Sequence, residues 1–300
     1  MNANNMETLN RYGAVLVTGT SSGIGRATAL RLASAGFVVF AGVRRPSDGD
    51  ALVRGAGERI RPVRIDVTDV ESITEAATVV EGALRGVLFR GLVNNAGIGV
   101  SGPLEAIPLA EVRRQYEVNV IGQIAVTQAF LPLLREGRGR IINICSVGDR
   151  ITIPFGGVLC GGKSALAATS EALRLELHPW GLHVCMIEPG SIRTAAIDKT
   201  LGDVDRRVAA MPPLAAKRYG EMLRRFTKRA VEREEHGSAP EVVAETILEA
   251  LTAARPKTRY LTGKDAHLLA LLGHWMPDRL LDRLRLRLFG LPTGFGAVTG

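Results

Sequence analysis

Short apolar runs recur along the first two hundred residues, and polar or glycine-rich segments follow them. The runs cover residues 14–18, 37–43, 60–66, a fourth stretch that closes at 92–94, then 141–145 and 183–187. Such runs are typical of parallel strands covered on both faces. Segments with helical spacing lie between them, for example at 27–36 and 115–134. The alternation predicts an α/β protein with a doubly wound parallel sheet, a Rossmann fold, in one domain.

The chain divides into three expected parts. Residues 1–12 form a polar tail, residues 13–262 form the Rossmann-type domain, and residues 263–300 form a basic amphipathic C-terminal extension. A helix at 279–288 would place leucines 280, 281, 284 and 288 on one face and arginines 279, 283 and 287 on another. This helix could pack on the protein over a substrate entrance, pack in a dimer, or lie on an anionic membrane surface.

Composition and charge exclude several classes of protein. The N-terminus has no apolar segment typical of a secretory signal, and no later stretch reaches eighteen uninterrupted apolar residues, so we expect a cytoplasmic protein. Cys145, Cys160 and Cys185 are too scattered for a disulfide framework or a metal site, and no metal is expected. The net charge of +8 is concentrated at 206–233 and 279–287 without accompanying aromatics, which favours solvated helix faces over nucleic-acid binding.

A glycine-rich turn follows the first apolar run. Residues 19–25 read GTSSGIG and precede a helical pattern that ends at Gly36. Glycines allow a tight turn and let backbone N–H groups approach a pyrophosphate, which then rests at a helix N-terminus. The alternative is a plain turn between strand and helix. The turn supplies six candidate cofactor-binding residues: Gly19, Ser21, Ser22, Gly23, Ile24 and Gly25.

Motifs in the middle of the chain resemble the short-chain dehydrogenase/reductase family. They are Asn94-Asn95-Ala96-Gly97, Ser146-Val147-Gly148, Pro154-Phe155, Cys160, Lys163 and the segment 189–194, PGSIRT. The residues of these motifs are most similar to those of the hydroxysteroid and retinol dehydrogenase branch. The resemblance covers about 14–194 and is weaker as far as 262. It implies hydride transfer between a nicotinamide cofactor and an alcohol or ketone, a mobile substrate lid at about 195–237, and a dimer or tetramer.

The resemblance also implies catalytic roles, and one position departs from the pattern. Ser146 would hydrogen-bond the substrate oxygen, Lys163 would bind the nicotinamide ribose, and Asn119 would interrupt a helix and hold a water linked to the lysine. The family's proton-donating tyrosine falls thirteen residues after the serine, at Leu159. Leucine cannot transfer a proton, and losing a general acid typically costs about 10²–10⁴-fold in rate. Cys160 is an alternative donor, although adjacent helical positions point about 100° apart.

Further cofactor contacts are implied by the same resemblance. They are Asp66, Val67, Asn95, Ala96, Gly97, Lys163, Pro189, Gly190, Ile192 and Thr194. Arg44 ends the second apolar run, where NAD-selective enzymes place an acid, and an arginine can pair with a 2′-phosphate. NADP is therefore favoured over NAD. The alternative for Arg44 is a solvated loop cation.

Two functional hypotheses follow. The first is an NADP-dependent oxidoreductase acting on a small hydrophobic alcohol or ketone of the steroid, retinoid or long-chain carbonyl kind. Its activity would be impaired because Leu159 replaces the proton donor. The second is a catalytically degenerate dinucleotide sensor or the inactive partner in an oligomer. Leu159 favours the second hypothesis, whereas the cofactor motifs support both.

Overall fold

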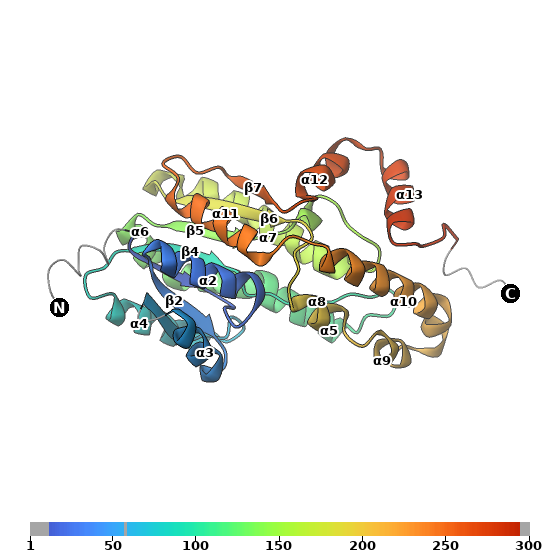
Figure 1. Cartoon of the computed structure of the whole chain (residues 1–300), viewed down its shortest axis with the longest axis horizontal. Coiled ribbons are helices and arrows are strands. Elements are labelled where there is room, and N and C mark those ends of the chain that lie inside the picture. Colours follow the sequence, from blue (N-terminus) through green and yellow to red (C-terminus); the bar gives the residue numbers. More distant parts are fainter. Residues whose placement is uncertain (1–11, 57–58, 295–300) are drawn as a thin grey trace.

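The computed structural model describes residues 12–56 and 59–294, and a seven-stranded sheet runs through its centre (Figure 1). The strand order is β3-β2-β1-β4-β5-β6-β7, and all neighbouring strands are parallel. The chain changes direction across the sheet between β1 and β4. Doubly wound sheets bind ligands at such a switch point, beyond the carboxyl ends of the strands. The predicted fold class is confirmed.

The strands coincide closely with the predicted apolar runs. Their bounds are β1 Ala14–Val17, β2 Val38–Val43, β3 Ile60–Arg64, β4 Phe89–Asn94, β5 Arg140–Ile144, β6 His183–Pro189 and β7 Arg259–Thr262. β1 and β3 end before Thr18 and Asp66, which we expected to close them. The Thr18 hydroxyl accepts a hydrogen bond from the N–H of Asn95, in the turn after β4, and the Asp66 carboxylate accepts one from Thr68, so these residues belong to the site rather than to the sheet.

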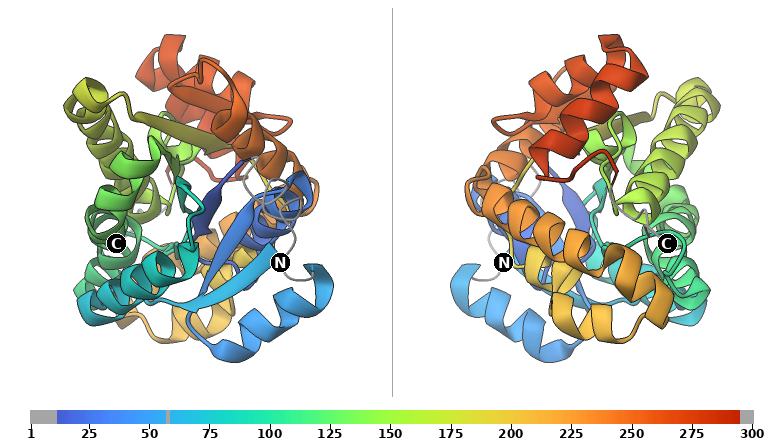
Figure 2. Two further views of the ribbon diagram at one scale, coloured as in Figure 1. Left: turned by 90° about the vertical axis from the view of Figure 1, so that its left-hand side faces the viewer. Right: turned by 90° about the vertical axis from the view of Figure 1, so that its right-hand side faces the viewer.

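Helices cover both faces of the sheet (Figure 2). One face carries α2 (Gly23–Ala35), α3 (Pro46–Ala56) and α11 (Pro240–Thr252), and the other carries α4 (Val70–Leu84), α6 (Gly122–Gly137) and α7 (Gly157–Leu177). Strand residues alternate between the two apolar cores: Val15 and Ile142 face the first set of helices, and Leu16 and Ile141 face the second. This burial on both faces explains the apolar runs. Asp69 caps α4, as predicted, by accepting hydrogen bonds from two backbone N–H groups.

The long helix predicted at 115–134 begins earlier and is interrupted. α5 (Leu109–Tyr116) passes through a π turn (Glu117–Ile121) into α6. By length and composition the stretch Leu109–Gly137 could cross a membrane, but half of its most apolar window is buried inside the protein. We interpret it as a core helix. A π turn often marks a functional position, and this one contains Asn119.

The predicted lid, residues 195–237, is helical rather than loosely structured. It forms α8 (Ala196–Leu201), α9 (Val204–Ala209) and α10 (Pro213–Glu235). Pro213 occupies the first turn of α10, where a missing N–H costs nothing. The lid packs around a third apolar core, in which the ring centroids of Phe155 and Phe226 are 5.4 Å apart and those of Phe226 and Phe289 are 4.8 Å apart.

The C-terminal extension consists of two helices, α12 (Ala266–Trp275) and α13 (Asp278–Leu288), with Pro277 preceding the second. Both lie at one end of the molecule, beside α10 (Figure 1). Of the leucines predicted to share a face of α13, Leu281 is buried, whereas Leu280, Leu284 and Leu288 are exposed. The predicted packing of this face on the protein is therefore only partial.

Candidate active site

The glycine turn lies at the switch point and leaves the N-terminus of α2 open. Gly19 and Gly23 have positive φ angles of 70° and 57°, which glycine adopts at no steric cost. A Cβ on Gly25 would collide with the carbonyl oxygen of Gly19. Ser22 is the N-cap of α2 but its side chain makes no capping hydrogen bond, and the first turn holds no acidic residue. The backbone donors and the positive end of the helix are thus available to a pyrophosphate.

Asn95 joins the turn after β4 to the glycine turn. Its Nδ2 donates to the carbonyl oxygens of Thr18 and Gly19, at 2.8 and 3.1 Å. The Thr18 hydroxyl accepts from the backbone N–H groups of Asn95 and Ala96, both at 3.0 Å. The two turns predicted to hold the nucleotide are therefore held together by four hydrogen bonds. Thr18 was not predicted, because its role depends on the pairing of β1 with β4.

A buried polar network continues from Asn94 across the sheet. Its Nδ2 donates to Asn143 Oδ1 of β5 at 2.8 Å and to Thr127 Oγ1 of α6 at 2.9 Å. Asn143 in turn donates to Ser170 of α7 at 2.7 Å. Networks of this kind fix a unique core arrangement when their members are satisfied. This one links the nucleotide side to the helix that carries Lys163.

Arg44 and Asp66 approach each other beyond the ends of β2 and β3. Arg44 is exposed, with no ion pair within the described residues. Burial acts to raise the pKa of Asp66, but hydrogen bonds from Thr68 and the nearby charges of Arg44 and Arg64 hold it below its ordinary value. The residues predicted for the adenosine end of the cofactor are thus brought together, with an unpaired cation beside them.

Asn119 and Gln115 hold the loop that follows Gly97. Asn119 Oδ1 accepts from the N–H of Ile98 at 2.9 Å, and its Nδ2 donates to the carbonyl of Ile98 at 2.8 Å. Gln115 accepts from the N–H of Val100 at 2.6 Å and donates to Val158 at the start of α7, at 2.7 Å. Gln115 was missed because no local pattern marks it.

Ser146 and Lys163 converge at the ends of β5 and β6. The Ser146 hydroxyl accepts from the N–H of Gly148 at 3.0 Å and donates to the carbonyl of Pro189 at 3.5 Å. Lys163 Nζ donates to the carbonyl of Ile144 at 2.6 Å. Burial lowers the pKa of Lys163, while the charges of Cys145 and Asp149 act to raise it.

Leu159 lies in the first turns of α7, one helical turn before Lys163 and hence on the same face. Its side chain is half-buried. The neighbouring Cys160 points elsewhere, because its sulfur lies 3.2 Å from the position that a Cβ on Gly148 would take. Burial raises the pKa of Cys160, so the thiol is a poorer acid than usual. Cys160 is therefore badly suited to replace a tyrosine hydroxyl.

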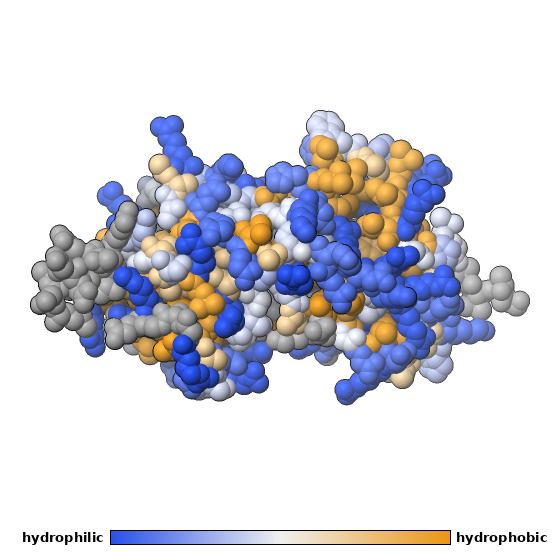
Figure 3. Space-filling model, in the orientation of Figure 1, coloured by the Kyte–Doolittle hydropathy of each residue, from blue (hydrophilic) through white to orange (hydrophobic). Residues whose placement is uncertain are grey.

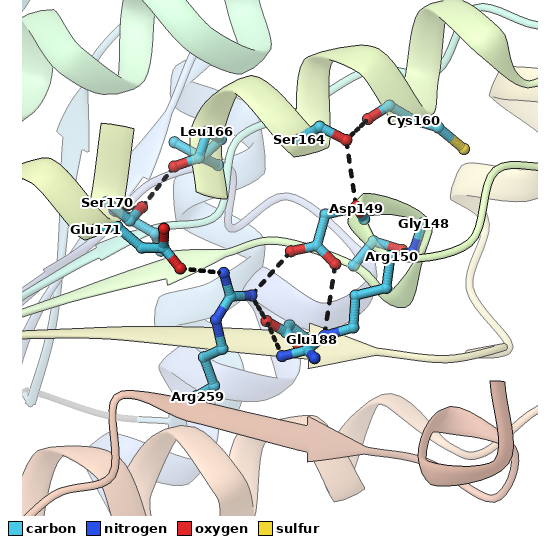
Figure 4. Close-up of polar contacts among 12 residues, drawn as sticks. Gly148, Asp149, Arg150, Cys160, Ser164, Leu166, Ser170, Glu171, Glu188 and Arg259 are labelled. Atoms are coloured by element: carbon cyan, nitrogen blue, oxygen red, sulfur yellow. Dashed lines mark hydrogen bonds and ion pairs between the residues drawn. The ribbon is translucent and has the colours of Figure 1, made fainter. Parts of the chain in front are cut away.

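An ion cluster holds the loop residues Asp149 and Arg150, which follow Ser146 (Figure 4). Glu188 of β6 is fully buried and accepts from Arg150 at 2.7 Å and from Arg259 of β7. Arg259 also pairs with Asp149 at 3.1 Å and with Glu171 of α7 at 2.7 Å. Two guanidinium groups thus form ion pairs with three carboxylates, and these pairs connect the loop after β5 to β6, β7 and α7.

Asp149 is the least satisfied member of this cluster. Burial and the charge of Glu188 raise its pKa to about 6, although Arg259 and Arg150 act in the opposite direction. Its Oδ1 is buried and has no hydrogen-bond partner within the described chain. A titratable carboxyl therefore lies three residues after Ser146 and within electrostatic reach of Lys163.

The segment 189–194 links the lid to the glycine turn. The N–H of Gly190 donates to Thr262 at 2.9 Å, and the N–H of Ile192 donates to Glu234 of α10 at 3.1 Å. A Cβ on Gly23 would lie 3.3 Å from the Thr194 side chain. Burial and the charge of Asp265 raise the pKa of Glu234 to about 7. Glu234 was not predicted, since it lies far along the chain from the segment that it holds.

Comparison with known proteins connects this geometry to a family. Residues 13–204 match the family described as short chain dehydrogenase. Human retinol dehydrogenase 5 is 38% identical over 277 residues, which cover 89% of this chain and 86% of that protein. An NADPH-dependent 3-dehydrocapnine reductase from Ornithobacterium rhinotracheale is 32% identical over 274 residues, covering 90% and 94%. A Burkholderia cenocepacia short chain dehydrogenase, solved in complex with NADP, superposes with a TM-score of 0.68 at 27% identity, covering 91% and 97%.

Proposed function

The chain belongs to the short-chain dehydrogenase family and is an oxidoreductase acting on CH–OH groups with NAD(P), and from that premise we propose that it uses NADP on a bulky apolar alcohol or ketone. One observation carries the proposal. The open glycine turn, fixed by Asn95, lies on the same edge of the sheet as Ser146 and Lys163. A dinucleotide bound at the turn could reach both side chains.

The residues at the crevice fit a dinucleotide. The turn at 19–25 would hold the pyrophosphate, Asp66 and Val67 the adenine, and the segment 189–194 the nicotinamide end. Arg44 supports NADP, because it is an exposed cation with no ion pair in the described chain and can pair with a 2′-phosphate. One relative is named as NADPH-dependent and one related structure was solved with NADP. When bound, the nicotinamide supplies the hydride acceptor or donor.

Ser146 and Lys163 supply orientation and charge. The Ser146 hydroxyl can exchange its weak 3.5 Å bond to Pro189 for one to the substrate oxygen. Lys163 lies close to the same place; burial lowers its pKa, and the nearby Cys145 and Asp149 act in the opposite direction, towards its charged form. A cation and a hydroxyl donor stabilise negative charge as it develops on the substrate oxygen.

Leu159 removes the proton donor from this arrangement. A missing general acid costs roughly 3–5 kcal/mol of barrier, and the orientation and burial of Cys160 make it a poor replacement. We therefore propose slow turnover, with nucleotide binding retained at micromolar affinity or better. The alternative function is a dinucleotide sensor or the inactive partner of an oligomer, and Leu159 is the observation that favours it.

The apolar lid supports a bulky apolar substrate. Phe155, just before α7, packs against Phe226 of α10, and Phe226 packs against Phe289, so an aromatic and aliphatic cluster lies beside the start of the helix that carries Leu159. We further propose a homodimer or homotetramer, located in the cytoplasm, with peripheral membrane contact through residues 263–300.

The test restores the missing hydroxyl. Oxidation of NADPH is measured with a panel of hydrophobic ketones for the wild type, for Leu159→Tyr, and for Leu175→Tyr as a control at an exposed position on the same helix. We expect Leu159→Tyr to raise kcat by about 10²–10⁴-fold and Leu175→Tyr to leave it unchanged. Nucleotide affinity is measured in parallel by NADPH fluorescence.

Each outcome separates the hypotheses. Activity confined to the tyrosine variant, with tight NADPH binding by the wild type, would favour the sensor. Slow wild-type turnover supports the oxidoreductase. If neither the wild type nor Leu159→Tyr binds NADPH, both hypotheses are refuted.

A further inference from the structure

The two helices of the C-terminal extension leave an unusually apolar surface open to solvent. We define the C-terminal apolar face as Leu268, Leu271 and Trp275 of α12 and Leu280, Leu284 and Leu288 of α13. The exposed fractions of these residues are 59%, 56% and 74%, and 52%, 36% and 46%. Figure 3 shows the apolar side chains gathered over these helices, at the upper right. Patches of this kind on a folded protein mark interaction sites.

A groove opens on the same face. It has a volume of about 650 Å³, which is within the usual size of ligand cavities, and lies between α10, α12 and α13. Leu268, Leu284 and Leu288 line its walls and are also members of the exposed face. The apolar lining of the groove and the apolar face therefore form one continuous surface.

Cations surround this surface. Arg279, Arg283 and Arg287 of α13 are exposed and form no ion pair within the described residues. Lys264 and Arg285 line the groove, and the buried Arg285 Nε has no hydrogen-bond partner in the described part of the chain. The acids of α13 are Asp278 and Asp282, and the second is paired with Arg285 at 3.0 Å. Two carboxylates line the groove as well, and both are paired, Glu232 with Arg229 at 3.3 Å and Asp265 with Arg233 at 2.6 Å. The occupant of the face should therefore be apolar in its body and anionic at its edge.

Three kinds of occupant meet the apolar requirement, but they differ in charge and extent. A second copy of the same face would bring like-charged α13 helices together, because a two-fold contact pairs a patch with itself. A soluble amphiphile could fill the groove, but it would leave Leu271 and Trp275 in water, since neither lines the groove. An anionic bilayer covers the whole face and pairs with its arginines. Tryptophan also favours the boundary between lipid and water.

We propose that the C-terminal apolar face docks on an anionic lipid bilayer, with α12 and α13 in the interface and an acyl chain of one lipid in the groove. Ile151, which lines the inner end of the groove, lies five residues after Ser146. If the proposed function holds, the docked face would also place a membrane-dissolved substrate close to the catalytic loop. The docking itself does not depend on turnover.

The test uses Trp275 as the reporter. The chain has two tryptophans, so Trp180→Phe leaves Trp275 as the only tryptophan, and its emission is excited selectively at wavelengths that tyrosine does not absorb. This protein is titrated with vesicles of phosphatidylcholine alone, or of equal parts phosphatidylcholine and phosphatidylserine, and is also sedimented with them. We expect a blue shift of Trp275 emission and sedimentation with the anionic vesicles, both reduced by salt.

Charge variants identify the docking face. Replacing Arg279, Arg283 and Arg287 by Gln should weaken vesicle affinity by about 100-fold, since a basic residue near an anionic surface contributes about 1 kcal/mol. The control replaces Arg113 and Arg114, exposed arginines of α5, by Gln and should leave affinity unchanged.

Several results would overturn the proposal. One is that a protein that binds NADPH normally does not sediment with anionic vesicles, and another is that the two sets of variants lose vesicle affinity equally. A blue shift that follows protein concentration without lipid would also overturn it and would indicate that a second copy covers the face. Saturable binding of oleate without vesicle binding would indicate a soluble amphiphile. If the protein binds anionic vesicles but reduces none of the ketones, the proposed function is refuted and the docking proposal stands.

Discussion

The two sides of the crevice are held together by different forces. On the nucleotide side, neutral groups carry the contacts: Asn95 bonds to Thr18 and Gly19, and Asn94 bonds to Asn143. On the side formed by the Ser146 loop and the segment 189–194, here called the substrate side although it also includes the proposed nicotinamide end, charged groups carry them. The Ser146 loop rests on the ion cluster of Asp149, Arg150, Glu188 and Arg259, and the segment at Ile192 is held by Glu234.

This difference determines how each side responds to its surroundings. Amide and hydroxyl bonds do not titrate near neutral pH, so the nucleotide side should keep its geometry across that range. The substrate side contains two carboxyls with raised pKa values, about 6 for Asp149 and about 7 for Glu234. Its geometry should therefore depend on pH, and its stability on keeping every buried charge paired.

The largest effect should follow from removing Arg259. Arg259→Met leaves Asp149 without its closest partner and Glu188 with Arg150 alone. We expect a loss of about 3–5 kcal/mol in the free energy of unfolding, because a buried charge is left uncompensated. Urea denaturation measures it. Arg114→Met, which breaks the exposed pair with Glu111, should cost less than about 1 kcal/mol.

A second variant tests the cause of that loss. Adding Asp149→Asn to Arg259→Met removes one orphaned carboxylate, so part of the lost stability should return. If the double variant is no more stable than Arg259→Met, the loss reflects packing rather than charge.

The next effect is a pH dependence that originates at Glu234. Its pKa is about 7 in the folded protein and 4.5 in a model carboxyl, so the folded state binds more protons between these values. The contribution of Glu234 to the free energy of unfolding is fully present below pH 4.5 and falls as pH rises towards 7, by up to about 3 kcal/mol. Glu234→Gln keeps an acceptor for Ile192 and cannot ionise.

Thermal denaturation at several pH values measures this effect. Glu234→Gln should match the wild type in acid and exceed its stability above pH 7, whereas Glu235→Gln, at an exposed neighbour, should follow the wild type throughout. Parallel curves for wild type and Glu234→Gln would contradict the assignment.

A steric change should disturb the nucleotide side without any charge. Gly25→Ala places a Cβ against the carbonyl of Gly19 and the amide of Asn95. We expect a loss of about 1–3 kcal/mol from overpacking, together with weaker NADPH binding. Gly82→Ala is the matched control, because nothing lies within 4 Å of its Cβ and alanine favours a helix. Equal effects at the two glycines would refute the role given to the turn.

The smallest effect should be a change of cofactor preference. Arg44→Gln should weaken NADPH binding about tenfold relative to NADH, by removing a charged hydrogen bond to the 2′-phosphate. Arg45→Gln serves as the control, because Arg45 is already paired with Asp48 at 3.2 Å. Titration calorimetry with both nucleotides measures the ratio. An unchanged ratio would leave Arg44 as a solvated loop cation.

Much of the fold could be predicted because its causes are local. The runs at 14–18 and 141–145 are apolar since both faces of β1 and β5 are buried, and the glycine turn is recognisable from seven consecutive residues. One departure also has a local cause. The apolar spacing at 115–134 alone does not reveal a π turn, although the resemblance implied that Asn119 interrupts the helix, and the structure has the π turn at Glu117–Ile121.

The candidate site was predicted only where it follows a motif. Ser146, Leu159 and Lys163 stand at fixed spacings, and the structure places Leu159 and Lys163 on one helix face. The residues that hold the site in place do not belong to a motif with fixed spacing. Thr18, Gln115 and Glu234 act on partners that lie far away in the chain, so no window of sequence contains both members of any pair.

Neighbouring residues were sufficient to predict the order of strands and helices along the chain, and to propose the glycine turn as the nucleotide site and Leu159 as the position of the proton donor. Tertiary structure decided which charges are buried together and which leucines stay exposed. Arg259 meets Glu188 and Asp149 only because β7 pairs with β6 beside the end of β5, and Leu284 is exposed only because α13 packs through Leu281. Whether a side chain is buried depends on which distant segments of the chain pack against it, and those segments meet only in the complete fold.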